Sequence, residues 1–294
     1  MHDVIVIGGG LAGLTSAMAC AQYGLNTIVI SRRIGGSINE TPIVETLPGI
    51  RPIFGPDLAK KLQEECKSAG VEFRESEISE IRSGFTLYNI ADHANEKHKA
   101  KAIIIATGRS PQMLEIAGEE EFLGKGITTN PISDLETLQN NSVAVYGSGE
   151  RAGLTALWLS SMCQKVHLIC PKPRLHVTPL TNERIQKTLR IETHLNSAVK
   201  KISGSINLES VATEKAQMNV SGLVLCERGR PHLSFLKVNM QISDGIAVDS
   251  AMKTSAKGIF ACGNVLSGEE VLAPETVMQA WQAAESAYKF VRGK

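Results

Sequence analysis

The sequence predicts an α/β fold, for three reasons. Apolar runs of strand length alternate along the chain with segments of helical composition. Two segments, residues 3–24 and 140–170, each pass from such a run through a glycine-rich turn into a helix. The chain has 294 residues, of which 43% are hydrophobic, so it is long enough to bury a sizeable core and to form two domains.

The first of these segments, DVIVIGGGLAGLTSAMACAQYG, carries the spacing Gly-x-Gly-x-x-Gly at Gly8, Gly10 and Gly13. Glycines at these positions let the backbone approach a pyrophosphate. The N-terminus of the following helix offers its free N–H groups and the positive end of its dipole to the phosphates. The segment therefore predicts a Rossmann-like unit that binds a dinucleotide.

The next strand, NTIVIS, ends at Ser31 and is followed by Arg32. An acidic side chain often binds the ribose of a dinucleotide at this place. Ser31 and Arg32 are therefore candidate cofactor contacts that depart from the usual pattern, and the ribose contact stays open.

Residues 140–170 repeat the arrangement, with Gly147, Gly149 and Ala152 in the turn. Two such units in one chain predict two Rossmann-like domains and two bound nucleotides.

Three shorter pieces extend this pattern. They are IIIATGRSP at 103–111, LVLCERGRP at 223–231 and GIFACGNV at 258–265. The first and last place a glycine turn directly after an apolar strand, and the middle piece is a looser version of the same arrangement. Together with the two longer units they have the layout of a flavoprotein with two dinucleotide-binding domains.

With these motifs in place, the chain resembles the low-molecular-weight thioredoxin reductases over nearly its full length. The resemblance rests on GGGLAG at 8–13, GGSINETPIVETLPG at 35–49, ATG, GSGERA and GIFACGN, in matching order and spacing. It implies a homodimer that binds FAD together with NADPH or NADH. It also implies a discontinuous FAD domain, residues 1–115 and 241–294, around an inserted nicotinamide-nucleotide domain, residues 116–240.

The FAD contacts that the resemblance implies come from several separate parts of the discontinuous domain. They are Gly8, Gly10, Gly13, Ser31, Arg32, Gly35, Gly36, Ser37, Thr46, Thr107, Gly108, Gly263 and Asn264.

In the resembled family the inserted domain begins with Cys-x-x-Cys-Asp, whose dithiol takes electrons from the flavin. Counted back without a gap from the second glycine turn, these positions hold Asn130, Ser133 and Asp134. An amide and a hydroxyl do not undergo thiol–disulfide exchange, so we expect a chain that is not a functional thioredoxin reductase. Asp134 has two candidate roles: the N-cap of a helix over LETL, or a catalytic acid–base group beside the flavin.

The six cysteines are scattered without a Cys-x-x-Cys pair. Reduced thiols, and a first strand that starts at Asp3 with no room for a leader, indicate a cytoplasmic protein. Cys262 stands beside a predicted flavin contact but fits a small packing residue, as the other cysteines fit core or strand-end positions. The histidines show no ligand-like pairing with the cysteines, so we expect no metal site.

The loop after the second strand of the inserted domain reads CPKPR, where relatives that select NADPH carry HRRxxxR. Lys172 and Arg174 are candidate contacts for the 2′-phosphate, but the two prolines reshape the loop and remove backbone donors. A solvated basic loop explains the two cations equally well. We therefore expect a nucleotide at the second glycine turn, with poor discrimination between NADH and NADPH.

A formal net charge of +1 gives no electrostatic reason for a nucleic-acid or anionic-membrane partner. Three consecutive glycines interrupt the apolar stretch that starts at Val4, which argues against a membrane span. We expect a small molecule or a redox protein as the substrate.

Three functions fit these features. The first is an FAD-dependent oxidoreductase that passes electrons between a nicotinamide nucleotide and a non-dithiol acceptor. The second is a flavoenzyme that has lost nicotinamide binding and takes electrons from its substrate or from a second bound flavin. The third is a flavin-binding sensor or assembly protein without catalysis.

Overall fold

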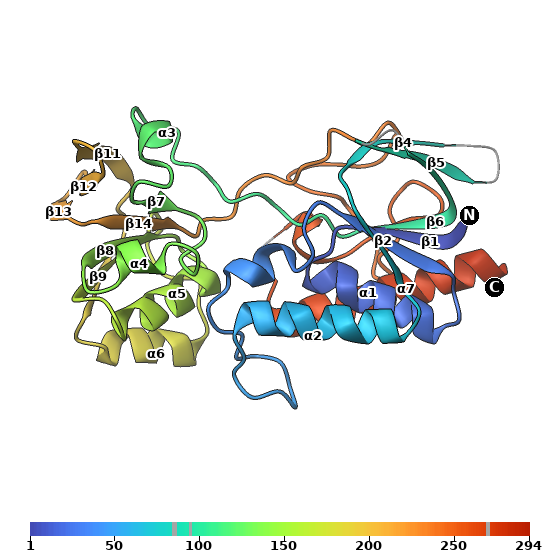
Figure 1. Ribbon diagram of the computed structural model, residues 1–294, viewed down its shortest axis with the longest axis horizontal. Coiled ribbons are helices and arrows are strands. Elements are labelled where there is room, and N and C mark those ends of the chain that lie inside the picture. The colour runs from blue at the N-terminus through green and yellow to red at the C-terminus, as the bar shows by residue number, and fades with distance from the viewer. Residues whose placement is uncertain (84–86, 94–95, 269–270) are drawn as a thin grey trace. The chain divides into compact units, whose positions relative to one another are not determined.

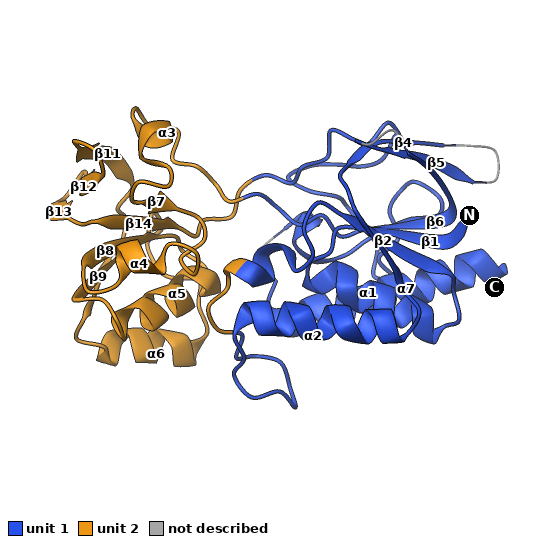
Figure 2. Ribbon diagram, viewed as in Figure 1, with its two compact units in different colours: residues 1–39, 44–110, 230–294 blue, residues 40–43, 111–229 orange. Residues whose placement is uncertain are grey.

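The computed structural model describes residues 1–83, 87–93, 96–268 and 271–294. The chain folds as an α/β protein in two compact units, which Figure 2 shows in different colours. Unit 1 comprises residues 1–39, 44–110 and 230–294, and unit 2 comprises residues 40–43 and 111–229. The predicted fold class is confirmed.

A seven-stranded sheet forms the centre of unit 1, in the order β3-β2-β1-β6-β5-β4, with β15 also paired to β6 (Figure 1). The pairs among β3, β2, β1, β6 and β15 are parallel, and β4 and β5 add an antiparallel edge. Val4, Ile5 and Val6 of β1 are fully buried, because a central parallel strand is covered on both faces. The strands are β1 (His2–Ile7), β2 (Thr27–Ser31), β3 (Glu72–Glu75), β4 (Ile78–Arg82), β5 (Tyr88–Asp92), β6 (Lys97–Ile105) and β15 (Ile259–Ala261).

Three long helices lie on one side of this sheet (Figure 1). They are α1 (Leu11–Gln22), α2 (Gly55–Ser68) and α7 (Ala273–Arg292). Helices α1 and α7 pack against each other through small residues, among them the fully buried Ala17, Ala280 and Ala284. Small side chains let the two helices approach closely. Two short 3-10 helices, η1 (Gly36–Glu40) and η2 (Gly263–Val265), follow β2 and β15.

Unit 2 contains a five-stranded parallel sheet in the order β10-β9-β8-β14-β7, and a three-stranded antiparallel sheet in the order β11-β12-β13. The strands are β7 (Ile127–Thr128), β8 (Ser142–Tyr146), β9 (Lys165–Ile169), β10 (Ile191–His194), β11 (Val199–Gly204), β12 (Leu208–Thr213), β13 (Gln217–Asn219) and β14 (Gly222–Leu225).

The parallel sheet of unit 2 separates two cores. On one side Val143, Val145 and Leu168 pack with helices α5 and α6, and on the other side Ala144 and Ile169 pack with the smaller sheet (Figure 1). The alternation of buried residues along β8 and β9 produces these two faces. The helices of unit 2 are α3 (Glu119–Phe122), α4 (Leu135–Leu138), α5 (Glu150–Ser160) and α6 (Pro179–Lys187).

The chain crosses between the units at 39/40, 43/44, 110/111 and 229/230, and the last two crossings come earlier than the predicted 115/116 and 240/241. Residues 230–240 have no helical or strand pattern that would assign them from sequence. In the structure Ile81 of β4 donates its N–H to Phe235 and accepts the N–H of Lys237, so this segment belongs to unit 1. None of the helices in the described ranges is long and apolar enough to cross a membrane.

Candidate functional site

The first glycine turn joins β1 to α1 and is folded tightly against the strand next to it. A Cβ atom at Gly8, where φ is +105°, would lie 2.3 Å from the carbonyl oxygen of Ala106. A Cβ atom at Gly13 would lie 1.8 Å from the carbonyl oxygen of Gly8. A Cβ atom at Gly10 would meet nothing within 4 Å. Two glycines therefore shape the turn, and the third leaves open space in front of the N-terminus of α1.

Gly35 and Gly36 complete the wall of this turn. The Gly35 N–H donates to the carbonyl of Gly9 at 2.7 Å, and a Cβ atom at Gly36 would lie 3.1 Å from Cα of Gly10. Ser37, in the next position, is exposed. Thr46 is half-buried in a loop closed by paired backbone hydrogen bonds between Val44 and Ile53, and its cofactor role stays a prediction.

The end of β2 carries no carboxylate. The Ser31 hydroxyl donates to the carbonyl of Arg33 at 3.0 Å, and Arg32 is exposed. The Arg33 guanidinium donates to the carbonyl of Gly36 at 3.1 Å. This loop thus offers a ribose a hydroxyl that is already hydrogen-bonded and cationic side chains, in place of the usual acid.

Three adjacent parallel strands bring the remaining predicted contacts of unit 1 to one edge of the sheet. Ile7 of β1 pairs with Ile105 of β6, which pairs with Ala261 of β15, so the residues after each strand end lie close together. Gly8, Thr107, Gly108, Gly263 and Asn264 follow these ends. The carboxyl ends of parallel strands are the usual place for a cofactor in an open α/β sheet.

Thr107 carries a buried hydroxyl oxygen that has no hydrogen-bond partner within the described part of the chain. Gly108, with φ of +63°, faces space that a Cβ atom would not fill. By contrast, the Asn264 side-chain oxygen accepts the Val271 N–H at 3.3 Å, and its carbonyl accepts Nε of Arg109 at 2.8 Å. An orphaned buried hydroxyl next to open space fits a bound group that supplies the missing partner.

The second glycine turn joins β8 to α5 and has the same backbone pattern. A Cβ atom at Gly147 would lie 2.9 Å from Cβ of Ala152, which is fully buried, and Gly149 is the N-cap residue of α5. Gly147 and Ala152 thus hold the turn against the helix, and their predicted role in binding a nucleotide stays a prediction.

A carboxylate occupies this second turn. The Ser148 N–H donates to Oε2 of Glu227 at 2.9 Å, and the Ser148 hydroxyl donates to Oε1 at 3.1 Å. Glu227 follows β14, the strand next to β8. In the sequence, LVLCERGRP is recognisable only as a looser glycine motif. Glu227 was not predicted as a site residue, because nothing in the local pattern places its side chain on the second turn.

Glu150, the first residue of α5, holds a second carboxylate at the same helix end. It accepts the Thr178 N–H at 2.7 Å and the Thr181 hydroxyl at 2.5 Å. Carboxylates are stabilised at a helix N-terminus by the positive end of the dipole, and they compete there with a phosphate.

The chain just after the CPKPR loop, which spans residues 170–174, pairs with this turn. The His176 N–H donates to the carbonyl of Ser148 at 2.7 Å, and the Cys170 thiol lies 3.5 Å from the carbonyl oxygen of Lys172. The side chains of Lys172 and Arg174 are exposed. They are available to a ligand at the loop, although no residue of the second turn holds them in place through a hydrogen bond in the described ranges.

The segment that replaces the dithiol forms its own hydrogen-bonded turn. The Asn130 side-chain oxygen accepts the N–H groups of Ile132 and Ser133 at 3.2 and 3.4 Å. The Ser133 hydroxyl donates to the carbonyl of Asn130 at 3.0 Å. Asp134 is half-buried at the N-cap position of α4, yet its side chain makes no capping hydrogen bond. Asn130 and Ser133 therefore stabilise the loop, and the Asp134 carboxylate accepts a long hydrogen bond, 3.5 Å, from the Ser133 hydroxyl.

All six cysteines are buried, and none of them forms a disulfide in the described structure. Burial raises the pKa of the Cys262 thiol to about 12 and those of Cys66 and Cys163 to about 11. Burial also raises the pKa of Cys20 and Cys170. Such thiols remain protonated near neutral pH and are poor nucleophiles.

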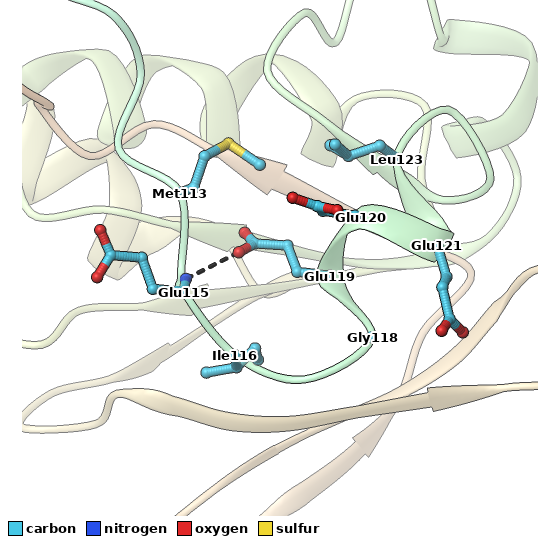
Figure 3. A pocket seen from close by; sticks show the side chains of 8 residues that line it. All are labelled: Met113, Glu115, Ile116, Gly118, Glu119, Glu120, Glu121 and Leu123. Carbon is cyan, nitrogen blue, oxygen red and sulfur yellow. Dashed lines mark hydrogen bonds between the residues drawn. The ribbon is translucent and has the colours of Figure 1, made fainter.

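A pocket of about 640 Å³ in unit 2 is lined by α3 and by residues just before and after it (Figure 3). Its buried Glu119 accepts the N–H groups of Leu114 and Glu115 at 2.7 and 2.8 Å. The carboxylate thus closes the loop that forms the pocket wall. None of the site residues predicted from sequence lines this pocket.

The chain belongs to the pyridine nucleotide-disulphide oxidoreductase family, whose sequence model matches residues 2–287. Within this family it is thioredoxin reductase-like, as the sequence predicted. It is 32% identical to the thioredoxin reductase of Listeria monocytogenes serovar 1/2a over 276 residues, which are 90% of this chain and 86% of that protein.

Two further proteins match nearly the whole chain. A 34.2 kDa protein in the rubredoxin operon of Clostridium pasteurianum is 30% identical, with 99% of this chain and 98% of that protein covered. The crystal structure of Lactococcus lactis thioredoxin reductase in the FR conformation superposes with a TM-score of 0.93 at 29% identity, covering all of both chains. The chain therefore has an oxidoreductase fold along its full length.

Proposed function

We propose that the chain is an FAD-dependent oxidoreductase that transfers electrons between a nicotinamide nucleotide and an acceptor without using a dithiol of its own. The observation that carries the proposal is the contrast between the open space at Gly10 and six buried cysteines that form no disulfide in the described structure. Bound FAD would supply the redox chemistry.

Several residues of unit 1 bind different parts of FAD in this proposal. The glycine turn and the N-terminus of α1 hold the pyrophosphate, because both Gly10 and the helix end face open space. Thr107 gives its unpartnered hydroxyl to the cofactor. Gly263, with φ of +77°, brings the backbone of η2 close to α1, where a Cβ atom would lie 2.7 Å from Cβ of Ala12.

Bound FAD would pass its electrons to the acceptor without a dithiol of this chain. Asn130 and Ser133 carry no sulfur, and their polar groups hold the loop. Cys262, close to the predicted flavin contacts, is fully buried and has a raised pKa. We expect no useful reduction of thioredoxin by NADPH, and robust turnover in a standard disulfide-reduction assay would overturn the proposal.

Glu227 favours a second candidate function, a flavoenzyme that no longer uses NADH or NADPH. Its carboxylate takes the Ser148 N–H, which is one of the donors available to a phosphate at the second turn. An anionic nucleotide must displace this carboxylate or bind beside it. The electrons would then come from the substrate or from a second flavin.

Anaerobic mixing of the FAD-loaded protein with NADH and with NADPH separates the two candidates. The first predicts reduction of the flavin by both, at rates within about tenfold of each other, which corresponds to about 1.4 kcal/mol. The reason is that Lys172 and Arg174 are exposed and lack a defined 2′-phosphate site. A strong preference for NADPH would show that these two side chains do form such a site. Absence of reduction by either nucleotide would favour the second candidate.

We further propose a cytoplasmic homodimer, as the resemblance to the thioredoxin reductases implies. The partner that accepts the electrons is a small molecule or a redox protein. Molar mass measured by light scattering tests the dimer, and a single monomeric species at micromolar concentration would contradict it.

A further inference from the structure

Three side chains of unit 2 that play no part in the proposed redox chemistry meet at the edge of the parallel sheet. His167 lies on β9, and Glu192 and His194 lie on β10, the edge strand. The register pairs Glu192 with His167, and His194 lies two residues further along β10, so all three side chains project from the same face. These residues are named here the β9–β10 histidine cluster.

The potential ligand atoms of the cluster point toward one another. His167 Nδ1 lies 3.0 Å from His194 Nε2. His167 Nδ1 lies 3.9 Å from Oε2 of Glu192, and His194 Nε2 lies 3.7 Å from Oε1 of Glu192. His167 is buried, and only a tenth of its side chain is exposed, so the cluster has one protected side.

We propose that the β9–β10 histidine cluster binds a divalent transition-metal ion of the zinc type, with His167 Nδ1, His194 Nε2 and a Glu192 carboxylate oxygen as ligands. Two imidazoles and a carboxylate form a known ligand set for zinc, with solvent in the fourth position. This site was not predicted from the sequence, because its ligands lie on two different strands.

The distances suit such an ion. Zinc lies about 2.0–2.2 Å from nitrogen and oxygen ligands, so two ligands of a tetrahedral site are about 3.3 Å apart. The three separations in the cluster, 3.0, 3.7 and 3.9 Å, lie around this value. Rotation of the half-exposed Glu192 side chain is enough to close the two longer ones.

The two histidines face each other through ring nitrogens, and an uncharged imidazole carries a lone pair on one nitrogen and a proton on the other. In the hydrogen-bonded pair one of the two facing nitrogens carries a proton. Metal binding moves that proton to the other nitrogen of the same ring, and no net charge is lost.

Lys165 is the competitor for the metal. Its ammonium group contacts Oε2 of Glu192, and both side chains are about half exposed. A metal ion has to replace this contact, and the positive charge of Lys165 opposes its approach. Removal of Lys165 should therefore strengthen metal binding, whereas it would matter little if the histidines only hydrogen-bonded to each other.

The structure contains a similar group that provides a control. Asp92, Glu96 and His98 of unit 1 also bring their ligand atoms together. There the Arg74 guanidinium lies 2.8 Å from Glu96 and 3.5 Å from Asp92, so a permanent cation already balances the carboxylates. We assign no metal to this group.

Calorimetric titration of the full chain with Zn²⁺, after treatment with a chelator and dialysis, tests the proposal. We expect one bound ion per chain. Glu192→Gln and His194→Gln should each weaken binding by about 100-fold or more, beyond the 10- to 100-fold that loss of an outer partner typically costs. His167→Gln should act in the same direction, and His98→Gln should leave the affinity unchanged.

Lys165→Met supplies a result of opposite sign, because it should tighten binding about threefold to tenfold by removing a charge near the ion. It also covers the case in which a substitution at the buried His167 impairs folding. Zinc binding that survives both Glu192→Gln and His194→Gln unchanged would overturn the proposal. So would failure of both the original chain and the Lys165→Met variant to bind zinc.

Discussion

The two glycine-rich turns share a sequence pattern and a backbone shape, yet they differ in what their backbone faces. In unit 1, Gly10 faces open space, and the neighbouring Thr107 hydroxyl is unpartnered among the described residues. In unit 2, the Ser148 N–H and hydroxyl are both bonded to Glu227. A glycine motif fixes the path of the backbone, whereas access for a phosphate depends on a side chain that comes from a neighbouring strand.

The difference also bears on how each turn stays stable without a ligand. The carboxylate of Glu227 satisfies the donors of the second turn, and Glu150 satisfies those of the Thr178–Thr181 segment beside it. The first turn has no such internal substitute at Thr107. We therefore expect unit 1 to gain more from its dinucleotide than unit 2 gains from its own.

The largest effect should follow from Gly10→Val. A Cβ atom at this position meets nothing within 4 Å, so the chain should fold, but the valine side chain fills the space in front of α1. Loss of two charge-assisted hydrogen bonds to the pyrophosphate, each worth about 1.5–3 kcal/mol, should weaken FAD binding about 100-fold or more. The flavin content of the purified protein measures this.

The matched change at the second turn, Gly149→Ala, should leave the flavin content as it was. An unaltered flavin content in the Gly10→Val variant, with normal circular dichroism, would show that FAD does not use the first turn.

A smaller effect, a gain in affinity for the nicotinamide nucleotide, is expected from Glu227→Ala. The substitution frees the Ser148 N–H and removes a negative charge from the phosphate position, which should tighten NADPH or NADH binding about tenfold, or about 1.4 kcal/mol. Calorimetry with each nucleotide gives the affinities.

Glu227→Gln keeps an oxygen that accepts the Ser148 N–H and removes only the negative charge. Comparison of the two variants therefore separates the effect of the occupied N–H from the effect of charge repulsion on the phosphate. If neither variant changes the affinity for NADPH or NADH, displacement of the Glu227 side chain costs no binding free energy. Glu227 then does not explain a difference between the two turns.

The smallest effects, of opposite sign, should follow from Thr107→Val. In the absence of cofactor the variant should be as stable as the original chain or more stable by up to about 1 kcal/mol, because a buried unpartnered hydroxyl is removed. FAD binding should weaken about fivefold to tenfold, since a hydrogen bond to the cofactor is lost. Chemical denaturation and flavin titration provide the two numbers.

Thr155 on α5 of unit 2 also has a buried, unpartnered hydroxyl in the described structure and serves as the control. Thr155→Val should alter stability but not FAD affinity. Equal loss of FAD affinity in both threonine variants would remove Thr107 from the site.

Much of the fold could be predicted because it depends on local patterns. Apolar runs such as VIVI and SVAVY became buried parallel strands, and the glycines at 8, 10, 147 and 149 lie in the turns between strand and helix. These features depend only on residues that are close together in the sequence. The segment 230–240 was misassigned because its contact with β4 is long-range and it has no periodicity of its own.

The features that sequence missed also depend on distant partners. Glu227 and Ser148 are 79 residues apart, and they meet only because β14 pairs with β8. His167 and His194 are 27 residues apart and meet through the register of β9 and β10. A one-residue slip of that register would turn His167 and Glu192 to opposite faces, so no spacing rule could find the cluster.

The central claim is that the flavin works without a dithiol, and the number of electrons that the protein takes up tests it most directly. The FAD-loaded protein is titrated with dithionite under anaerobic conditions, which does not depend on nicotinamide binding. The account predicts that one two-electron equivalent per bound FAD reduces the protein completely, because none of the six cysteines is in a disulfide and thiols accept no electrons. A second two-electron equivalent per FAD would reveal a redox-active disulfide and contradict the account.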